Sequence, residues 1–316
     1  MIPIFAYDIA PDGTARETGP DAPLPDEGYR WIHCDFTHEG TREWLFAALP
    51  ERTAEILSQP ETRPRALSHA GGLIVLLRGL NLDPAADDPE DMVGLRTWVE
   101  PRRVVTVRRR PVQAARDIEA QVREGAPPRS PQLLLVALAT NFMGRIEDRG
   151  VAMEDRLDAL EDLLFADDRH PDRKLLPEMR TAAIRLHRFL GPQASALHAL
   201  TAPGLPVIDD EAREDLSEIA DRAQRAVEEI TAVRDRLAAL SDHVDLRHGM
   251  RLSKNSYVLS VVAAIFLPMS FLTGLFGVNV AGMPGTSTSV AFGLLTLASL
   301  ALGIVVWLVL RGFRLL

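Results

Sequence analysis

The chain has 316 residues, of which 47% are hydrophobic and 25% are charged, and its formal net charge is −9. This acidic balance speaks against nucleic-acid binding and is compatible with a protein that attracts cations. The single cysteine, Cys34, excludes an intrachain disulfide and suits a cytoplasmic domain. The first residues lack a basic stretch followed by an apolar core, so we expect no signal peptide.

Short β-type runs alternate with turn residues up to about residue 110. Apolar and aromatic runs bounded by Gly, Pro and Asp predict strands. The predicted strands are Ile2–Ile9, Tyr29–Phe36, Gly72–Leu82, Met92–Glu100 and Val104–Arg108, with a helix near residues 40–58. The first part of the chain is therefore expected to be a mixed α/β region.

The pattern becomes helical after residue 111, with apolar residues recurring at intervals of three and four. The predicted helices are Val112–Arg123, Gln132–Phe165 and Glu178–Leu200. From about Asp209 no proline occurs until Pro268, which predicts one continuous helix from near residue 207 to 276. Such a helix is about 100 Å long. One small domain cannot cover it, so we expect a symmetric oligomer.

Residues 255–310 contain no charged side chain. Two spans of about 20 residues, 255–276 and 289–310, fit this stretch, with a Gly- and Pro-rich turn between them. A pair of buried helices in a soluble protein is the alternative. Basic residues flank the spans at Arg247, Arg251, Lys254, Arg311 and Arg314, whereas the turn has none. The positive-inside rule therefore places both termini in the cytoplasm.

The first span carries a stripe of small and hydroxyl-bearing residues when it is placed on a wheel at about 100° per residue. With Leu267 at the centre, the stripe includes Gly249, Ser253, Ser256, Ser260, Ala263 and Gly274. Asp242 falls on the same side, whereas the basic residues before the span point away from it. The stripe is either a close helix–helix contact or the wall of a water-filled path. Asp242 is a candidate for attracting cations toward such a path.

Sequence motifs of catalysis are not found. GxxxxGK[ST], GxGxxG, HExxH, CxxC and GxSxG do not occur. The eight histidines are scattered, and the basic residues between 102 and 110 are better explained as a solvated strand edge than as a phosphate site. An enzyme or sensor anchored by the hairpin is thus the weaker interpretation, and we expect no enzyme.

Gly277-Val278-Asn279, followed by Met283-Pro284, lies between the two spans. This triplet, in this position after a very long helix, resembles the CorA superfamily of divalent-cation transporters. Val278, where CorA typically carries Met, and Gly285, where an acid would stand, are closer to the ZntB branch. The segments GLIVLLRGLNLDP and MVGLRTWVEPRRVVTVRRR also resemble ZntB cytoplasmic segments, so the likeness covers most of the chain.

The resemblance implies a CorA-like funnel, a homopentamer in the inner membrane. Position by position, it implies that Gly277, Val278 and Asn279 form the outer ring, with Asn279 facing a hydrated metal ion. It also implies that Ser256, Ser260, Leu267 and Ser270 line the pore. With the stripe, the predicted pore-lining set is Ser253, Ser256, Ser260, Ala263, Leu267, Ser270 and Gly274.

The transported ion is predicted to be Zn²⁺, with a proton gradient assisting uptake, as the ZntB resemblance implies. The alternative is a CorA-type channel for Mg²⁺ or Co²⁺, and Ni²⁺ is a further candidate. No Cys, His, Asp or Glu lies between residues 255 and 310, so the path cannot offer zinc its usual ligands. Hydroxyl and amide oxygens would suit Mg²⁺. No resident cofactor is expected, and the expected partners are copies of the chain and membrane lipid.

The predicted organisation has six parts. They are an α/β cytoplasmic domain with a helical second half (1–205), a cytoplasmic stalk (206–254), a first membrane helix (255–276), an outer loop (277–288), a second membrane helix (289–310) and a cytoplasmic tail (311–316).

Overall fold

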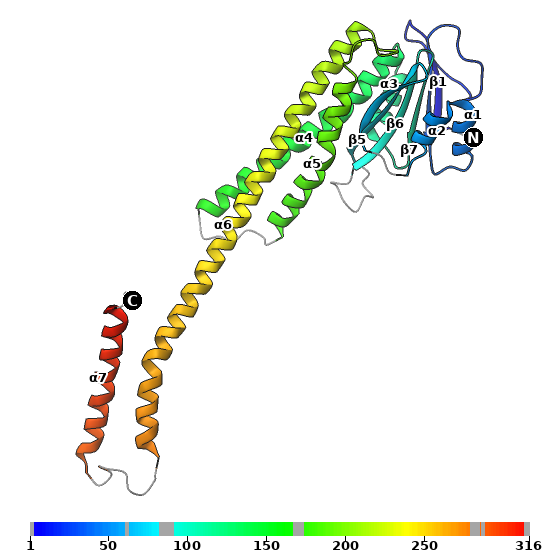
Figure 1. The fold of residues 1–316 in the computed structure, drawn as a ribbon. Helices are drawn as coiled ribbons and strands as arrows, with labels where there is room; N and C mark the ends of the chain where they lie inside the picture. Colours follow the sequence, from blue (N-terminus) through cyan, green and yellow to red (C-terminus); the bar gives the residue numbers. More distant parts are fainter. Residues whose placement is uncertain are drawn as a thin grey trace. The chain divides into compact units, whose positions relative to one another are not determined.

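The computed structural model describes residues 3–60, 63–81, 92–166, 174–278, 285 and 288–312. The chain divides into two compact units, Met1–Leu240 and Ser241–Leu316. The first unit is a mixed sheet with helices on both faces, followed by long helices, and the second contains two apolar helical segments (Figure 1). The predicted fold class is therefore confirmed. The six-part division of the chain stays a prediction.

The sheet has seven strands in the order β2-β1-β3-β7-β6-β5-β4. The strands are β1 (Phe5–Ile9), β2 (Ala15–Glu17), β3 (Tyr29–Asp35), β4 (Arg65–His69), β5 (Gly72–Leu80), β6 (Met92–Glu100) and β7 (Arg103–Arg108). Neighbours pair antiparallel except β3 and β7, which run parallel. The β4–β5 turn uses two residues, Ala70 and Gly71, both with positive φ. Such a turn matches the right-handed twist of the strands.

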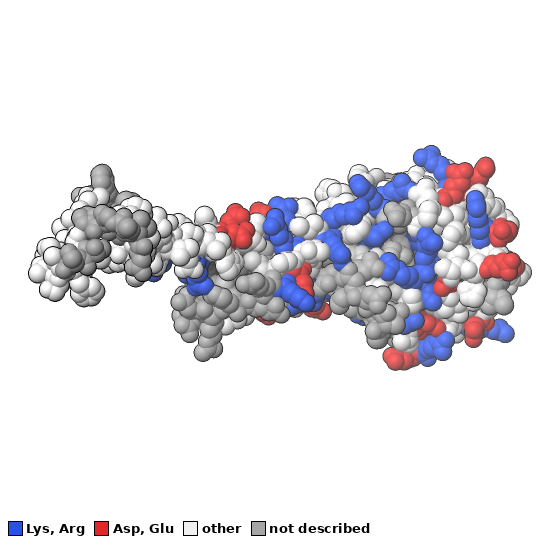
Figure 2. Space-filling model, turned by 90° about the horizontal axis from the view of Figure 1, so that it is seen from below, with Lys and Arg blue, Asp and Glu red and all other residues white. Residues whose placement is uncertain are grey.

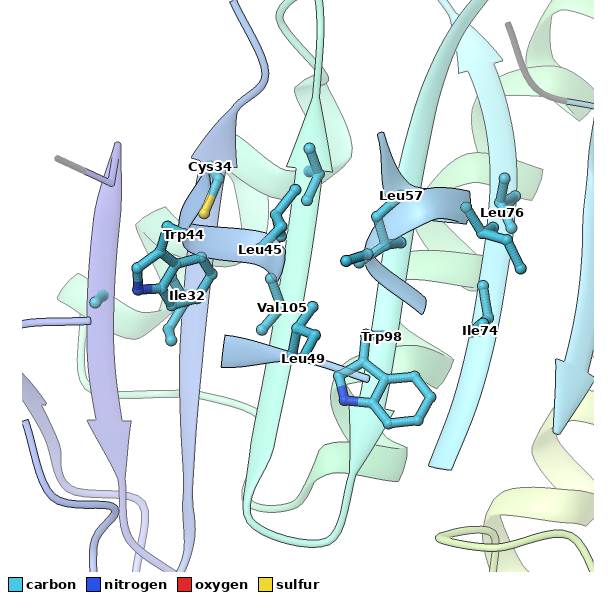
Figure 3. Close-up of a cluster of buried hydrophobic side chains, with 14 residues drawn as sticks. Ile32, Cys34, Trp44, Leu45, Leu49, Leu57, Ile74, Leu76, Trp98 and Val105 are labelled. Carbon is cyan, nitrogen blue, oxygen red and sulfur yellow. The ribbon is translucent and has the colours of Figure 1, made fainter. Parts of the chain in front are cut away.

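Two short helices, α1 (Thr41–Ala48) and α2 (Glu51–Leu57), cover one face of the sheet. The sequence predicted one helix here, and the break falls at Pro50. Its ring has no N–H to continue the first helix, and it suits the start of the second. Leu45 and Leu57 meet Trp98 and other strand residues in a buried apolar cluster (Figure 3).

The opposite face contacts α4 (Pro131–Ala166), against which α3 (Gln113–Arg123) packs. The approach of α4 depends on a glycine in β5. A Cβ added at Gly79 would lie 2.3 Å from Cδ1 of Phe142, so no larger residue fits without movement. The Phe142 side chain therefore fills the space that the glycine leaves.

Helix α5 (Leu175–Ala199) lies along the sheet edge next to β4 and β5. Strand β4 pairs with β5 as far as Leu76, so the backbone of β5 beyond that point needs another partner. The N–H of Arg78 donates to Oε1 of Gln193, a buried α5 side chain, over 2.7 Å. The Arg78 guanidinium lies 4.4 Å from the centroid of the Phe189 ring. A helix side chain thus accepts a hydrogen bond from the strand beyond the end of β4.

Helix α6 (Asp210–Gly277) begins three residues later than predicted and ends at the turn between the two spans. Asp209 precedes it, and its Oδ1 accepts from the N–H of Ala212 over 2.8 Å. This bond lowers the pKa of Asp209 below its usual value and satisfies one free N–H of the first turn. Buried residues recur at three and four along its first part, including Leu216, Ile219 and Ala223. Helix α7 (Val290–Gly312) follows after the turn.

Strands β2 and β4 were not predicted. Strand β2 has three residues with the burial pattern of an exposed edge. The five residues of β4 form the other edge and include Arg65 and His69. A short edge strand buries too little apolar surface to leave a periodic pattern.

Candidate functional site

Two helices are long and apolar enough to cross a membrane, α6 through its second part and α7. Charged residues are distributed over the N-terminal unit and leave an uncharged end on the second unit (Figure 2). The residues between Lys254 and Arg311 are those that the sequence marks as uncharged. These two helices are the only elements among the described residues that meet the length and composition of a span.

One face of α6 contacts α7. The half-buried residues of its apolar part are Val261, Ile265, Pro268, Met269 and Leu272. On α7 the least exposed residues are Ala291, Leu295, Ser299, Leu302, Gly303, Val306 and Leu310. A Cβ added at Gly303 would lie 3.4 Å from Sδ of Met269, so the glycine gives the methionine room. Bulky side chains of α6, rather than its small ones, therefore form the hairpin contact.

The small-residue stripe lies on the other side of α6. Its predicted pore-lining members are all exposed: Ser253, Ser256, Ser260, Ala263, Leu267, Ser270 and Gly274. At about 100° per residue, Leu267 points roughly 150° away from the centre of the α7-contacting face. Leu267 is also 74% exposed, the highest value for a leucine in the span. The stripe is thus not the contact between α6 and α7, and its role in lining a pore stays a prediction.

The hydroxyl groups of α6 are oriented by the helix itself. Oγ of Ser260 donates to the carbonyl of Ser256 over 2.9 Å. Because its hydrogen is directed into the helix, the Ser260 oxygen presents lone pairs outward. Such an oxygen accepts hydrogen bonds from water around a cation and carries no charge of its own. This geometry gives the stripe a polar surface without charge.

Pro268 interrupts the hydrogen bonding of α6 inside the span. Since proline has no N–H, the carbonyl of Ala264 loses its helical partner. Ala264 lies about 60° from Leu267 on the wheel, at the flank of the stripe. This carbonyl was not among the predicted site groups, although the proline that frees it is visible in the sequence. It adds a backbone acceptor beside the hydroxyl groups.

An open hollow on α6 lies before the uncharged segment and is lined by Asp242, Asp245, Leu246, Gly249, Met250 and Ser253. Asp242 was predicted on this side of the helix, and Asp245 was missed. The two carboxylates are three residues apart, a spacing that places them on one helix face. The two aspartates make this face acidic. Among the described residues no group of three or more His, Cys, Asp or Glu could hold a metal ion directly.

Only two of the three residues of the predicted outer ring lie in the described part of the chain. Gly277 is the last residue of α6, and Val278 follows with 53% of its surface exposed. Asn279 lies outside the described residues, as do Met283 and Pro284. The assignment of Gly277, Val278 and Asn279 to an ion-binding ring therefore stays a prediction.

Comparison with known proteins agrees with this arrangement. The family model of the CorA-like Mg²⁺ transporter protein matches residues 26–311. The divalent cation transporter CmaX of Pseudomonas aeruginosa is 33% identical over 320 residues, which cover 98% of this chain and 96% of that protein. The zinc transport protein ZntB of Klebsiella pneumoniae is 31% identical over 316 residues, covering 96% and 94% respectively.

A solved structure shows the same fold. The structure of the full-length CmaX protein superposes with a TM-score of 0.86 at 32% identity and covers 99% of this chain and 98% of that chain. The similarity therefore includes both units and the apolar hairpin, and it extends through the segment that holds the stripe. The protein belongs to the CorA-like Mg²⁺ transporter family.

Proposed function

We propose that the protein moves divalent cations across a membrane along the stripe of α6, and that Zn²⁺ is its ion. The observation that carries the proposal is the exposure of the stripe on the side of α6 opposite α7. An uncharged span that only anchored a domain would have no need for a polar face turned away from its own hairpin partner. Membership of a transporter family supports the same conclusion.

A path of this kind needs several copies of the chain, because one helix face cannot enclose water. Copies related by rotation would bring the same stripe to a common axis. The family resemblance supports five copies. The exposed side chains of Leu246 and Met250, which line part of the acidic hollow, offer apolar surface for contacts between neighbouring α6 helices.

Orientation follows from the charges at the hairpin ends. Arg247, Arg251 and Lys254 precede the first span and Arg311 follows the second. The excess of Lys and Arg at these ends favours cytoplasmic termini. Asp242 and Asp245 would then lie at the cytoplasmic mouth, where a negative potential concentrates cations.

Two observations favour Zn²⁺ as the ion, and one favours Mg²⁺. The ZntB relative is named a zinc transport protein, and Gly285 stands where an acid is expected in CorA. Against this, the stripe offers hydroxyl and carbonyl oxygens, which suit Mg²⁺ better than the nitrogen and sulfur ligands of zinc sites. A hydrated ion does not need direct ligands from the path, so the second argument is the weaker one. Transport of Mg²⁺ or Co²⁺ is therefore the second candidate.

The test is an ion flux measurement with the purified full-length chain in liposomes. Entrapped dyes would report Zn²⁺ and Mg²⁺ entry, each with and without an inward proton gradient. We expect Zn²⁺ entry that the proton gradient accelerates. Mg²⁺ entry without Zn²⁺ entry would assign the chain to the second candidate, and entry of neither ion would contradict transport.

A further inference from the structure

The side of α6 that faces α7 becomes basic where the uncharged segment ends. Arg247, Arg251 and Lys254 are all exposed there. On a wheel at about 100° per residue, each lies within about 60° of the centre of the α7-contacting face, the face that holds Ile265 and Met269. The three cations thus continue the hairpin contact face, on the side opposite the stripe.

This basic face extends past the end of α7. Gly303 is level with Met269, as their contact shows. From that level, α7 continues nine residues to Gly312, or about 14 Å, while Lys254 lies fifteen residues along α6, or about 22 Å away. Lys254 is therefore roughly 9 Å beyond the last described residue of α7, and the arginines lie farther along the same face.

The end of α7 adds a fourth cation and an aromatic ring. The guanidinium of Arg311 lies 5.3 Å from the centroid of the Trp307 ring. Trp307 is 42% exposed, and Tyr257, near Lys254 on α6, is 36% exposed. Amphipathic rings of this kind concentrate at the level of lipid headgroups. The cations and the rings together mark one boundary of the membrane on both helices.

We propose that Lys254 and Arg311 bind the phosphate of an anionic lipid headgroup at this boundary, and that Arg251 and Arg247, farther along the same face of α6, add the positive potential that favours an anionic lipid. Guanidinium and ammonium groups donate several hydrogen bonds to phosphate oxygens. The acyl chains would follow the apolar side chains that continue the same face into the span, such as Val258 and Val261. This continuity from cations to apolar surface fits a lipid better than a free phosphate ion.

The site is distinct from the proposed ion path. It lies on the opposite side of α6 from Asp242 and Leu267, so a lipid bound there would not enter the path. The inference requires the hairpin to span a membrane, but it does not depend on which ion is moved, or on transport itself. Its test can therefore succeed or fail independently of the flux measurement.

Native mass spectrometry of the full-length chain in mild detergent measures lipid binding directly. The probes are phosphatidylglycerol, phosphatidylcholine of the same acyl chains, and inorganic phosphate as a competitor. We expect phosphatidylglycerol to bind at least tenfold more tightly than phosphatidylcholine. Each cation near an anionic surface contributes about fivefold, so Arg247→Gln/Arg251→Gln/Lys254→Gln should remove this preference.

The matched control removes three exposed cations of the N-terminal unit, Arg16→Gln/Arg180→Gln/Arg225→Gln, which changes the net charge equally. It should bind phosphatidylglycerol like the unaltered chain, and Arg247→Lys/Arg251→Lys should retain most of the preference. Equal binding of both lipids to the unaltered chain would overturn the proposal. So would an undiminished preference in the triple Gln variant, or displacement of the lipid by millimolar inorganic phosphate.

Discussion

Arg236 on α6 holds the carboxylate of Glu161 on α4 in two hydrogen bonds, Nε–Oε1 of 3.2 Å and Nη2–Oε2 of 2.7 Å. Arg222 holds Glu147 in the same manner, over 2.9 and 2.6 Å. Both pairs are separated by 75 residues in the sequence, and they lie fourteen residues apart on each helix. Helices α4 and α6 therefore run parallel over two heptads in one register.

Reversing the charge of Arg236 should lower the stability of the N-terminal unit. Arg236→Glu would place a carboxylate beside Glu161 and Asp158, which now accept from the arginine. Because these groups are partly exposed, we expect a loss of about 1 kcal/mol, seen as a lower Tm that recovers in part at high salt. The double variant Arg236→Glu/Glu161→Arg should restore stability incompletely, since Asp158 still repels the new glutamate. Full restoration would contradict this explanation.

Gly79 and Gly144 make a matched pair for testing the sheet–helix contact. Gly79→Ala should cost about 1–3 kcal/mol, because its Cβ would overlap the Phe142 ring. Gly144→Ala, in the interior of α4 with nothing within 4 Å of the added Cβ, should instead stabilise by about 0.5–1 kcal/mol. Chemical unfolding followed by tryptophan fluorescence would measure both. Equal effects of the two substitutions would show that movement of the Phe142 ring or of α4 relieves the clash.

The sequence alone predicts some features of α6 and the hairpin but not others. The hairpin is predictable from the absence of charge between residues 255 and 310, and the continuity of α6 up to Pro268 is predictable from the absence of proline before it. The face of α6 that meets α7 is not, since it depends on Gly303 making room for Met269. For this reason the sequence could not decide whether the stripe is a helix–helix contact or the wall of a pore. Asp245 falls about 40° from Leu267 on the same wheel, so it was predictable together with Asp242 but was not named.

His33 should make folding sensitive to acid. Its ring is buried and its Nδ1 lies 2.8 Å from Oγ1 of Thr106. Burial, and then the nearby charge of Arg108, lower its pKa to about 3, with Arg116 acting in the same direction and Asp35 opposing. The unfolded chain, with a histidine pKa of about 6.5, binds the proton first. The contribution of neutral His33 is thus complete above pH 6.5 and is lost progressively as the pH falls toward 3.

The variant His33→Gln isolates this contribution. Lowering the pH from 7 to 5 should cost the unaltered chain on the order of 1–2 kcal/mol more than it costs the variant. His38→Gln is the control, because His38 is exposed and lies only five residues later in the chain. This variant should keep the full dependence of stability on pH. Unfolding midpoints in denaturant at a series of pH values would provide the comparison. Parallel curves for all three chains would rule out His33 as the source.

Leu267 is predicted to form an apolar constriction in the path. A ring of leucines resists wetting and closes a narrow pore without charge. Leu267→Ser should therefore raise basal ion leak several-fold in liposomes. Val262→Ser removes a comparable exposed aliphatic side chain about 140° away on the wheel and should leave the leak unchanged. An effect of equal size in both variants would indicate general disruption of the helix.

Asn279 is predicted to supply the outer ring with amide oxygens. Its carbonyl oxygen can accept from the water shell of a divalent ion, so Asn279→Ala should reduce flux at least tenfold while the oligomer stays intact. Asn255→Ala, at the other end of the span, is the matched control. Flux and native mass would be measured on the same preparations. Near-normal flux in Asn279→Ala would remove this residue from the path.

The bond from Arg78 to Gln193 has a consequence for synthesis of the chain. The strand end and the side chain that accepts its hydrogen bond are separated by 115 residues. At a synthesis rate of 5–20 residues per second, β5 waits roughly 6–23 s for this partner. During that interval its open backbone is available to strands of other nascent chains. The ribosome-bound intermediate, rather than the finished protein, is the stage at which holding by a chaperone would protect the fold.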